Sequence, residues 1–167
     1  LYEFLPEKVK EVWRKNAQVI TGFNCSYKCA FCINSVRKCK YESRPAEKII
    51  NDIEYIVKNF NPLDIYFRDE DFFQDFAKAK VIVDYLIEKK YKFRWDVSTR
   101  VNHFREGMVD DKFLKKLIES GCWRLRFGVE SGSQRVLDYL KKGQTVAQIK
   151  YAVGQCVKNN IHALCSI

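Results

Sequence analysis

Glycine and proline are scarce in this sequence, with 7 Gly and 3 Pro among 167 residues. Such a composition excludes collagen-like and low-complexity chains. No apolar run approaches the roughly 18 residues that a membrane-spanning helix needs. Residues 1–15 mix acidic and basic side chains, unlike a secretory signal peptide. We therefore expect a cytoplasmic protein without a membrane partner, about one domain in size and large enough to bury a core.

Both ends of the sequence lack the features of a complete chain. It begins at Leu1 rather than at a methionine, and it stops at Ile167 within the apolar stretch 163–167. No further helix or polar tail follows that stretch. We therefore expect the sequence to be a piece of a longer protein.

Positive charge is in excess, with 30 Lys and Arg against 21 Asp and Glu and a net charge of +9. Such an excess permits an anionic partner, for example a nucleic acid or a phosphorylated ligand. The basic residues are scattered and form no block of about five or six, which is more typical of lysines on the solvent faces of helices. The charge therefore permits nucleic-acid binding without favouring it.

Short β-branched and aromatic runs alternate with segments of helical periodicity. The expected strands are residues 18–23, 63–67, 92–98, 123–129 and a last one from 161 onward. The expected helices are residues 7–15, 43–60, 75–90, 110–120, 133–141 and one that opens with the capping box Thr145-x-x-Gln148. This alternation predicts an α/β fold with a parallel sheet and right-handed crossovers.

Polar residues follow the ends of several expected strands. They favour a partial (β/α) TIM-like barrel over a doubly wound sheet, because barrel active sites are built at the carboxyl ends of the strands. Five strands cannot close an eight-stranded barrel, so we expect an open arc that stops at about the fifth strand. Residues 1–16 would form an N-terminal connector helix, and residues 17–167 the first part of the barrel core.

The cysteines are seven in number, and an odd count without a secretory signal favours metal binding over a disulfide framework. Cys25, Cys29 and Cys32 form a C-x3-C-x2-C run directly after the first expected strand. Three thiolates at this spacing suit an iron–sulfur cluster with one open iron, or a zinc site that takes Cys39 as its fourth ligand. Three further cysteines are expected to be core thiols: Cys122, Cys156 and Cys165.

The three-cysteine run, with the aromatic Phe31 before its last cysteine, resembles the signature of the radical S-adenosylmethionine (SAM) superfamily. The resemblance covers residues 17–167. It implies that Cys25, Cys29 and Cys32 hold a [4Fe–4S] cluster whose fourth iron is chelated by the amino and carboxylate groups of SAM. It also implies that one electron from the cluster cleaves SAM to methionine and a 5′-deoxyadenosyl radical, which takes hydrogen from a substrate.

Further segments are similar to particular branches of that superfamily. Residues 65–73, where an acidic loop follows an apolar strand, resemble the second strand of the cobalamin-binding branch. Residues 127–133, Phe-Gly-Val-Glu-Ser-Gly-Ser, resemble the fourth-strand segment of that branch and of the methylthiotransferases, and residues 140–145 resemble the basic stretch after it. The resemblance implies cobalamin through a domain that usually precedes the barrel and is not in this sequence.

Three acids at expected strand ends are candidate SAM ligands. Asp69 or Glu70 could face the ammonium or sulfonium group of SAM. Glu130 could accept hydrogen bonds from its ribose or amino group. The alternatives are a solvated loop acid for the first two residues, and an acid that stabilises a helix N-terminus for Glu130.

Four other residues complete the predicted SAM site. Arg100 could pair with the SAM carboxylate in a bidentate contact or form a surface ion pair, and Ser98 is a second candidate on the same strand end. Phe31 could pack near the adenine or shield the cluster, and Lys142 could contact SAM or substrate or be a solvated helix end. His103 is expected to be exposed in a loop, with a contact to substrate as the alternative. No residue is assigned a catalytic role.

Three functions remain open from the sequence. The first is a radical SAM enzyme core of the cobalamin-dependent type, a methyltransferase or cyclase, with flavodoxin or ferredoxin as electron donor and an unidentified substrate. The second is a methylthiotransferase-like modifier of tRNA or protein, which the positive charge would suit. The third is a non-catalytic zinc- or cluster-binding structural module, which would leave the strand-end residues without a role.

Overall fold

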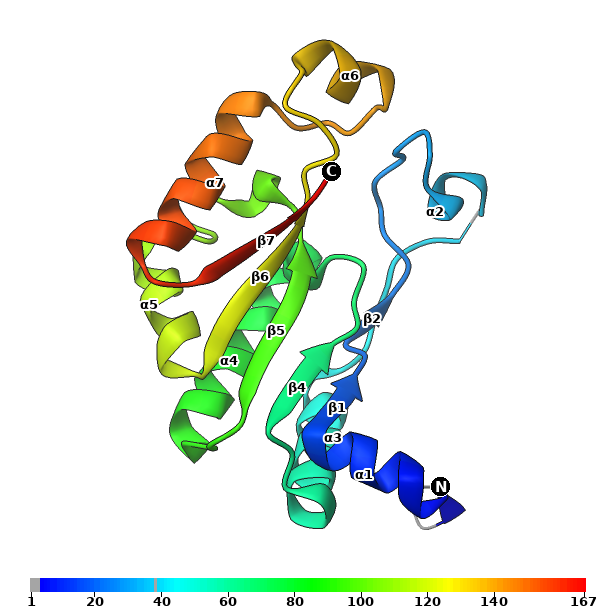
Figure 1. The fold of residues 1–167 in the computed structure, drawn as a ribbon, viewed down its shortest axis with the longest axis vertical. Helices are drawn as coiled ribbons and strands as arrows, with labels where there is room; N and C mark the ends of the chain where they lie inside the picture. The colour runs from blue at the N-terminus through cyan, green and yellow to red at the C-terminus, as the bar shows by residue number, and fades with distance from the viewer. Residues whose placement is uncertain (1–3, 38) are drawn as a thin grey trace.

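The centre of the protein is a five-stranded parallel sheet in the order β1-β4-β5-β6-β7 (Figure 1). The structure is a computed structural model that describes residues 4–37 and 39–167. The sheet consists of β1 (Asn16–Val19), β4 (Asp64–Phe67), β5 (Arg94–Thr99), β6 (Cys122–Gly128) and β7 (His162–Ser166). A separate antiparallel pair is formed by β2 (Gly22–Phe23) and β3 (Glu42–Ser43). The predicted α/β fold with a parallel sheet is confirmed.

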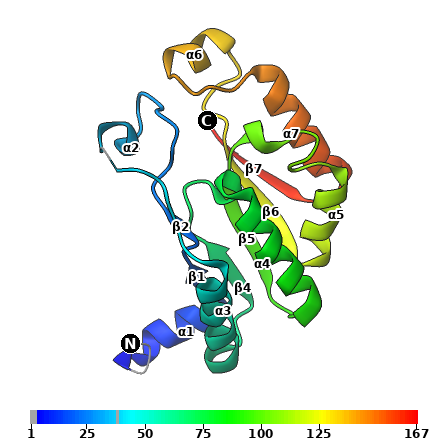
Figure 2. The same ribbon diagram turned by 180° about the vertical axis from the view of Figure 1, so that it is seen from behind.

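Helices occupy most of the connections between the strands. They are α1 (Glu7–Lys15), α2 (Ile33–Val36), α3 (Ala46–Phe60), α4 (Phe76–Lys89), α5 (Asp111–Glu119), α6 (Gln134–Tyr139) and α7 (Val146–Lys158). Two 3-10 turns, η2 (Phe72–Gln74) and η3 (Val101–His103), follow β4 and β5. Figure 2 shows α3, α4 and α5 on one face of the sheet, with α2 and α6 beyond the carboxyl ends of the strands. None of the helices in the described ranges is long and apolar enough to cross a membrane.

The first strand differs from the predicted run 18–23. Strand β1 ends at Val19, and the chain then leaves the parallel sheet so that β2 can pair with β3. Thr21 fixes this departure, because its backbone N–H and its hydroxyl donate to the Asp69 carboxylate at 3.1 and 2.7 Å. A Cβ at Gly22 would lie 2.8 Å from Tyr41 Oη, so a larger residue there would displace the Tyr41 side chain.

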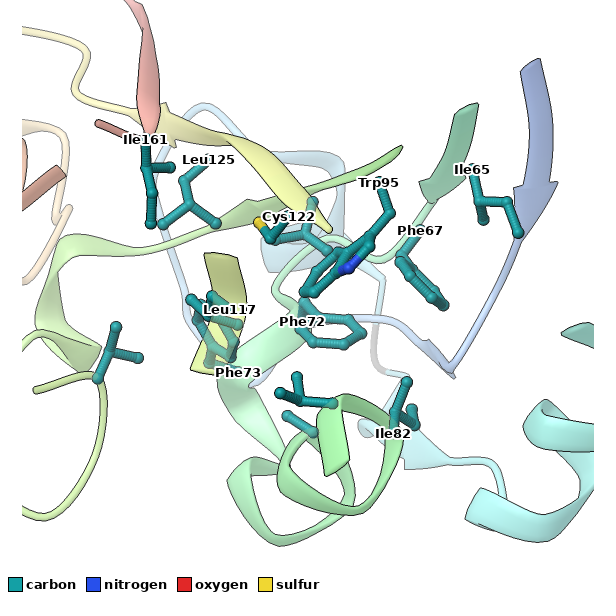
Figure 3. Packing of buried hydrophobic residues seen from close by; sticks show 14 of the residues in the cluster. Ile65, Phe67, Phe72, Phe73, Ile82, Trp95, Leu117, Cys122, Leu125 and Ile161 are labelled. Atoms are coloured by element: carbon teal, nitrogen blue, oxygen red, sulfur yellow. The ribbon is translucent and has the colours of Figure 1, made fainter. Parts of the chain in front are cut away.

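The helix-covered face of the sheet forms the hydrophobic core (Figure 3). Its strand residues are Ile65, Phe67, Trp95, Val97, Leu125 and Phe127, each at most 1 % exposed. Trp95 packs edge-on against Phe67, with ring centroids 5.4 Å apart, and its Nε1 donates to the Ser120 carbonyl at 2.8 Å. Burial of these large side chains is the main term that holds the helices against the sheet.

The opposite face of the sheet, called here the open face, carries polar side chains. Side chains alternate along a strand, so the residues between the core positions point away from the helices. They include Tyr66, Asp96, Ser98, Arg124 and Arg126. The open face therefore presents hydroxyl and charged groups beside the carboxyl ends of the strands.

Cys122 and Cys156 are buried in the core, as predicted. Burial raises the pKa of both thiols, to about 12 for Cys156. At pH 8 neither thiol forms the thiolate that reacts with alkylating agents, whereas Cys39 is exposed. We expect iodoacetamide to label Cys39 well before either core thiol, as peptide mass spectrometry would show. Labelling in denaturant serves as the control, and equally fast native labelling of Cys156 would contradict this packing.

Candidate active site

Three cysteine thiols meet in one cavity at the carboxyl ends of the strands. Cys25, Cys29 and Cys32 are free thiols in the loop between β2 and α2, and all three line a cavity of about 410 Å3. Cys29 is buried, and the other two are partly exposed. Burial, and to a lesser extent the charge of Asp71, raises the pKa of Cys25. The loop thus brings three sulfur ligands to one space.

Backbone and side-chain hydrogen bonds hold this loop in place from two sides. Ser26 exchanges two hydrogen bonds with Gln74, each 3.0 Å long, which ties the loop to η2. The Ala30 N–H donates to the Leu140 carbonyl at 2.8 Å, which ties it to the end of α6. The loop therefore takes its position from segments that follow β4 and β6.

Arg100 lies beneath the cysteine loop and makes several contacts within the protein. Its Nη1 donates to Cys29 Sγ at 3.4 Å, its Nε donates to Asn102 at 3.2 Å, and its Nη2 donates to the Lys142 carbonyl. Its guanidinium also stacks on the Tyr27 ring, 3.7 Å from the centroid. Arg100 is thus a clamp between the loop and the segment after α6.

Glu130 and Lys142 form an ion pair at the end of β6. Lys142 Nζ lies 2.9 Å from Glu130 Oε1, and the Lys142 side chain is 8 % exposed. The same Nζ lies 5.5 Å from the centre of the Phe31 ring, a cation–π contact with the cysteine loop. A Cβ at Gly128 would come within 2.6 Å of Glu130 Oε1 and 2.7 Å of Lys142 Nζ. Glycine at the strand end therefore leaves room for the pair.

Most of the residues predicted to bind SAM meet in this cavity. Besides the three cysteines, its lining includes Phe31, Glu70, Ser98, Arg100, Glu130 and Lys142. They come from the cysteine loop and from the ends of three neighbouring strands and the segments after them. Parallel strands bring their carboxyl ends to one edge, which is why residues so far apart in sequence meet there.

Asp69 is the one predicted SAM ligand that the structure does not bring to the cavity. Its side chain turns back under β2 and accepts two hydrogen bonds from Thr21. Lys78 donates to the Thr21 carbonyl at 2.6 Å in the same buried site. Burial raises the pKa of Asp69 against the opposing hydrogen bonds from Thr21, and burial lowers the pKa of Lys78. The acid that reaches the cavity is its neighbour Glu70.

His103 is buried, so its predicted exposure is wrong. The residue is 6 % exposed, and its Nε2 lies 2.8 Å from Asp71 Oδ2. Thr99 donates to the other oxygen of Asp71 at 3.3 Å, and the His103 ring contacts Phe73 edge-on. The loop after β5 folds back as η3 to reach the acidic loop after β4, a tertiary contact that local sequence does not reveal.

Several cavity residues were missed in the sequence: Tyr27, Asn34, Tyr66, Thr99, Arg126 and Ser166. Tyr66 and Arg126 are signalled only by alternation along β4 and β6, because each lies between two core residues. Tyr27 lies between the first two cysteines of the run, where an aromatic side chain could have suggested the observed stacking on a cation.

The donor set fits an iron–sulfur cluster better than a zinc ion. Within residues 4–37 and 39–167, no three His, Cys, Asp or Glu side chains are grouped closely enough to hold one metal ion. A zinc site requires all its thiolates about 2.3 Å from one ion, whereas in a cluster each thiolate binds a different iron, so the sulfurs stand farther apart. Cys39, the fourth ligand that zinc requires, is exposed and is not among the lining residues.

The chain is similar in sequence to curated proteins named as a methyltransferase and a cyclase. The chain is 30% identical over 165 residues to an uncharacterized methyltransferase of Pyrococcus horikoshii. The aligned region covers 98% of this chain and 35% of that protein. It is 27% identical to an anaerobic magnesium-protoporphyrin IX monomethyl ester cyclase of Rubrivivax gelatinosus, over 81% of this chain and 24% of that protein. The chain thus spans about a third or less of the length of these relatives.

Solved structures show the same fold. The radical SAM methyltransferase TsrM from Kitasatospora setae, solved with tryptophan and a SAM analogue, superposes with a TM-score of 0.79 at 19% identity. The superposition covers 95% of this chain and 31% of the TsrM chain. The cobalamin-dependent SAM radical enzyme OxsB gives a TM-score of 0.70 at 25% identity, over 91% of this chain and 23% of its own. The model of the radical SAM superfamily matches residues 19–167. This chain is a member of the radical SAM superfamily.

Proposed function

We propose that this chain is the part of a radical SAM enzyme that holds a [4Fe–4S] cluster through Cys25, Cys29 and Cys32. The observation that carries the proposal is one cavity lined both by these thiols and by polar groups from the ends of three strands. The cluster held by these three thiols would supply the single electron for the reductive cleavage of SAM. Membership of the superfamily implies both SAM and the cluster.

Different side chains around the cavity are proposed to bind different groups of SAM. The exposed Glu70 offers a carboxylate to its ammonium or sulfonium charge, and Glu130 offers one to its ribose or amino hydrogens. Lys142 holds Glu130 in place, and Phe31 offers an apolar surface for the adenine. Ser98 also lines the cavity, but its hydroxyl is hydrogen-bonded to the Tyr66 hydroxyl at 2.9 Å.

Arg100 serves as a positioning residue and keeps two N–H donors for the SAM carboxylate. Each of its three nitrogens already donates within the protein: to Asn102, to Cys29 Sγ and to the Lys142 carbonyl. These contacts use three of the five N–H donors of the guanidinium and fix its orientation. Its contribution is to fix Cys29 relative to Lys142, so that the cluster and the SAM ligands keep their separation.

The full-length protein is proposed to be a cobalamin-dependent methyltransferase or cyclase. The support comes from the curated relatives, which are named as a methyltransferase and a cyclase, and from the fold shared with OxsB. Cobalamin would be held by a domain outside these 167 residues. Flavodoxin or ferredoxin is the proposed source of the single electron.

The activity can be tested on the anaerobically reconstituted full-length protein. With dithionite as reductant, we expect 5′-deoxyadenosine and methionine to accumulate in equal amounts, as chromatography would measure. Omission of dithionite serves as the control and is expected to leave SAM intact. SAM that stays intact over a fully loaded and reduced cluster would contradict the proposal.

A further inference from the structure

Part of the cavity lining comes from the open face of the sheet rather than from the cysteine loop. Three of its residues, called here the floor group, are Tyr66 on β4, Ser98 on β5 and Arg126 on β6. These strands are adjacent, and Ser98 and Arg126 are partners in the register of β5 and β6. The Tyr66 and Ser98 hydroxyls lie 2.9 Å apart. The group thus offers two hydroxyls and a guanidinium to one space.

Beside the floor group, one carboxylate is shared between two guanidinium groups. Asp96 accepts hydrogen bonds from Arg126 Nη2 at 2.9 Å and from Arg124 Nε at 2.8 Å. Its side chain is only 6 % exposed, and those of Arg124 and Arg126 are 20% and 30% exposed. Two cations and one anion leave an excess positive charge in a partly dry site. Such a charge is costly to bury unless a further anion pairs with it.

Arg126 is the member of this cluster that faces the cavity. Its guanidinium carbon lies 4.3 Å from the centre of the Tyr66 ring, a cation–π contact that helps to hold it there. Its Nε is enclosed and has no hydrogen-bond acceptor within the described part of the chain. Arg124 does not line the cavity. The excess charge and an unused donor therefore coincide at Arg126.

The direction of the Arg126 side chain separates it from the proposed SAM site. Its Nη2 donates to Asp96, and Asp96 is the register partner of Arg124. Arg124 lies two residues before Arg126 on β6, so the Arg126 side chain points back from the carboxyl end of the strand. Two residues of strand correspond to about 6.6 Å. SAM must chelate an iron held by the cysteine loop, beyond the strand ends. A ligand group that meets Arg126 in this orientation lies deeper than the cluster.

We propose that Arg126, with the hydroxyls of Tyr66 and Ser98, binds an anionic group of the substrate, a carboxylate or a phosphate. The identity of this molecule as the substrate rests on the proposed function. An oxyanion suits the floor group because the guanidinium and one of the two hydroxyls can donate to it while the hydroxyls stay hydrogen-bonded to each other. The acids Glu70 and Glu130 also line the cavity, but Glu70 is exposed and Glu130 is paired with Lys142.

The test uses small aromatic anions as probes for the unidentified substrate. Saturation-transfer NMR on the reconstituted, SAM-saturated full-length protein would measure the binding of benzoate, phenyl phosphate and the neutral benzamide. The variant is Arg126→Gln, and the matched control is Arg124→Gln, which removes the other partner of Asp96. The SAM affinity of each protein, measured by calorimetry, separates a defect in the SAM site from one in the floor group.

We expect the wild-type protein to bind one or both anions at least about tenfold more tightly than benzamide. Arg124→Gln should keep part of this preference, because it removes the excess charge but leaves the donors of Arg126 in the cavity. Arg126→Gln should lose this preference and keep its SAM affinity. The better of the two anions tells whether the group is a carboxylate or a phosphate. Equal anion binding by Arg126→Gln, no anion binding by the wild type, or a loss of SAM affinity in Arg126→Gln would each overturn the inference. Failure of the proposed function would give a different result, because neither the wild-type protein nor either variant would then bind SAM.

Discussion

Replacing Cys29 with alanine is expected to abolish cluster assembly. Cys29 is the buried member of the three thiols and the acceptor of the hydrogen bond from Arg100. A site with only three protein thiolates cannot lose one and still hold the cluster, because two irons would then lack a protein ligand. Iron and acid-labile sulfide in the reconstituted protein, measured per chain, should fall to the background level. Cys25→Ala and Cys32→Ala should behave in the same way.

The matched control for these variants is Cys39→Ala. Cys39 is exposed and lies outside the cavity that the other three thiols line, so its removal should leave the iron and sulfide content unchanged. Comparing the iron and sulfide content of the three cavity variants with that of Cys39→Ala therefore identifies the cluster ligands. Full iron content in any of the three cavity variants, or its loss in Cys39→Ala, would show that the ligand set is wrong.

Replacing Glu130 with alanine is expected to weaken SAM binding by at least about tenfold, because a hydrogen bond to a charged group contributes about 1.5–3 kcal/mol. Glu130 lines the cavity at the end of β6 and is held there by Lys142 Nζ at 2.9 Å. It is not a cluster ligand, so iron and sulfide should stay at the wild-type level. Calorimetric titration with SAM would measure the effect.

Glu47→Ala is the control for this experiment. Glu47 is an exposed acid in the first turn of α3, outside the cavity, so its loss changes the net charge by the same amount without touching the site. Glu130→Gln adds a second test, since it keeps the shape of the side chain and removes only the charge. Unchanged SAM affinity in both Glu130 variants would reduce Glu130 to the structural partner of Lys142.

Local patterns in the sequence predicted the elements of the fold well. The capping box at the start of α7 is present, since Gln148 N donates to Thr145 Oγ1 at 3.1 Å and Thr145 N donates to Gln148 Oε1 at 2.8 Å. The order of alternating strands and helices gave the parallel sheet. The strand predicted over 18–23 was too long, because its β-branched run continues through a turn that Asp69 fixes from 48 residues away.

The positions of the site residues were easier to predict than their partners. The rule that polar groups gather at the carboxyl ends of parallel strands placed Glu70, Ser98 and Glu130 in one cavity. It could not tell Asp69 from Glu70, because which of two adjacent acids turns inward depends on Thr21. Nor could it show that Asp71 meets His103, a contact made across two loops.

The central claim is that SAM reaches an open iron of a cluster held by the cysteine loop. Electron paramagnetic resonance of the anaerobically reconstituted, dithionite-reduced full-length protein, recorded with and without SAM, tests it most directly. The account predicts the signal of a reduced [4Fe–4S] cluster and a change in that signal when SAM is added. A cluster signal indifferent to SAM, or a protein that binds zinc in place of a cluster, would contradict it.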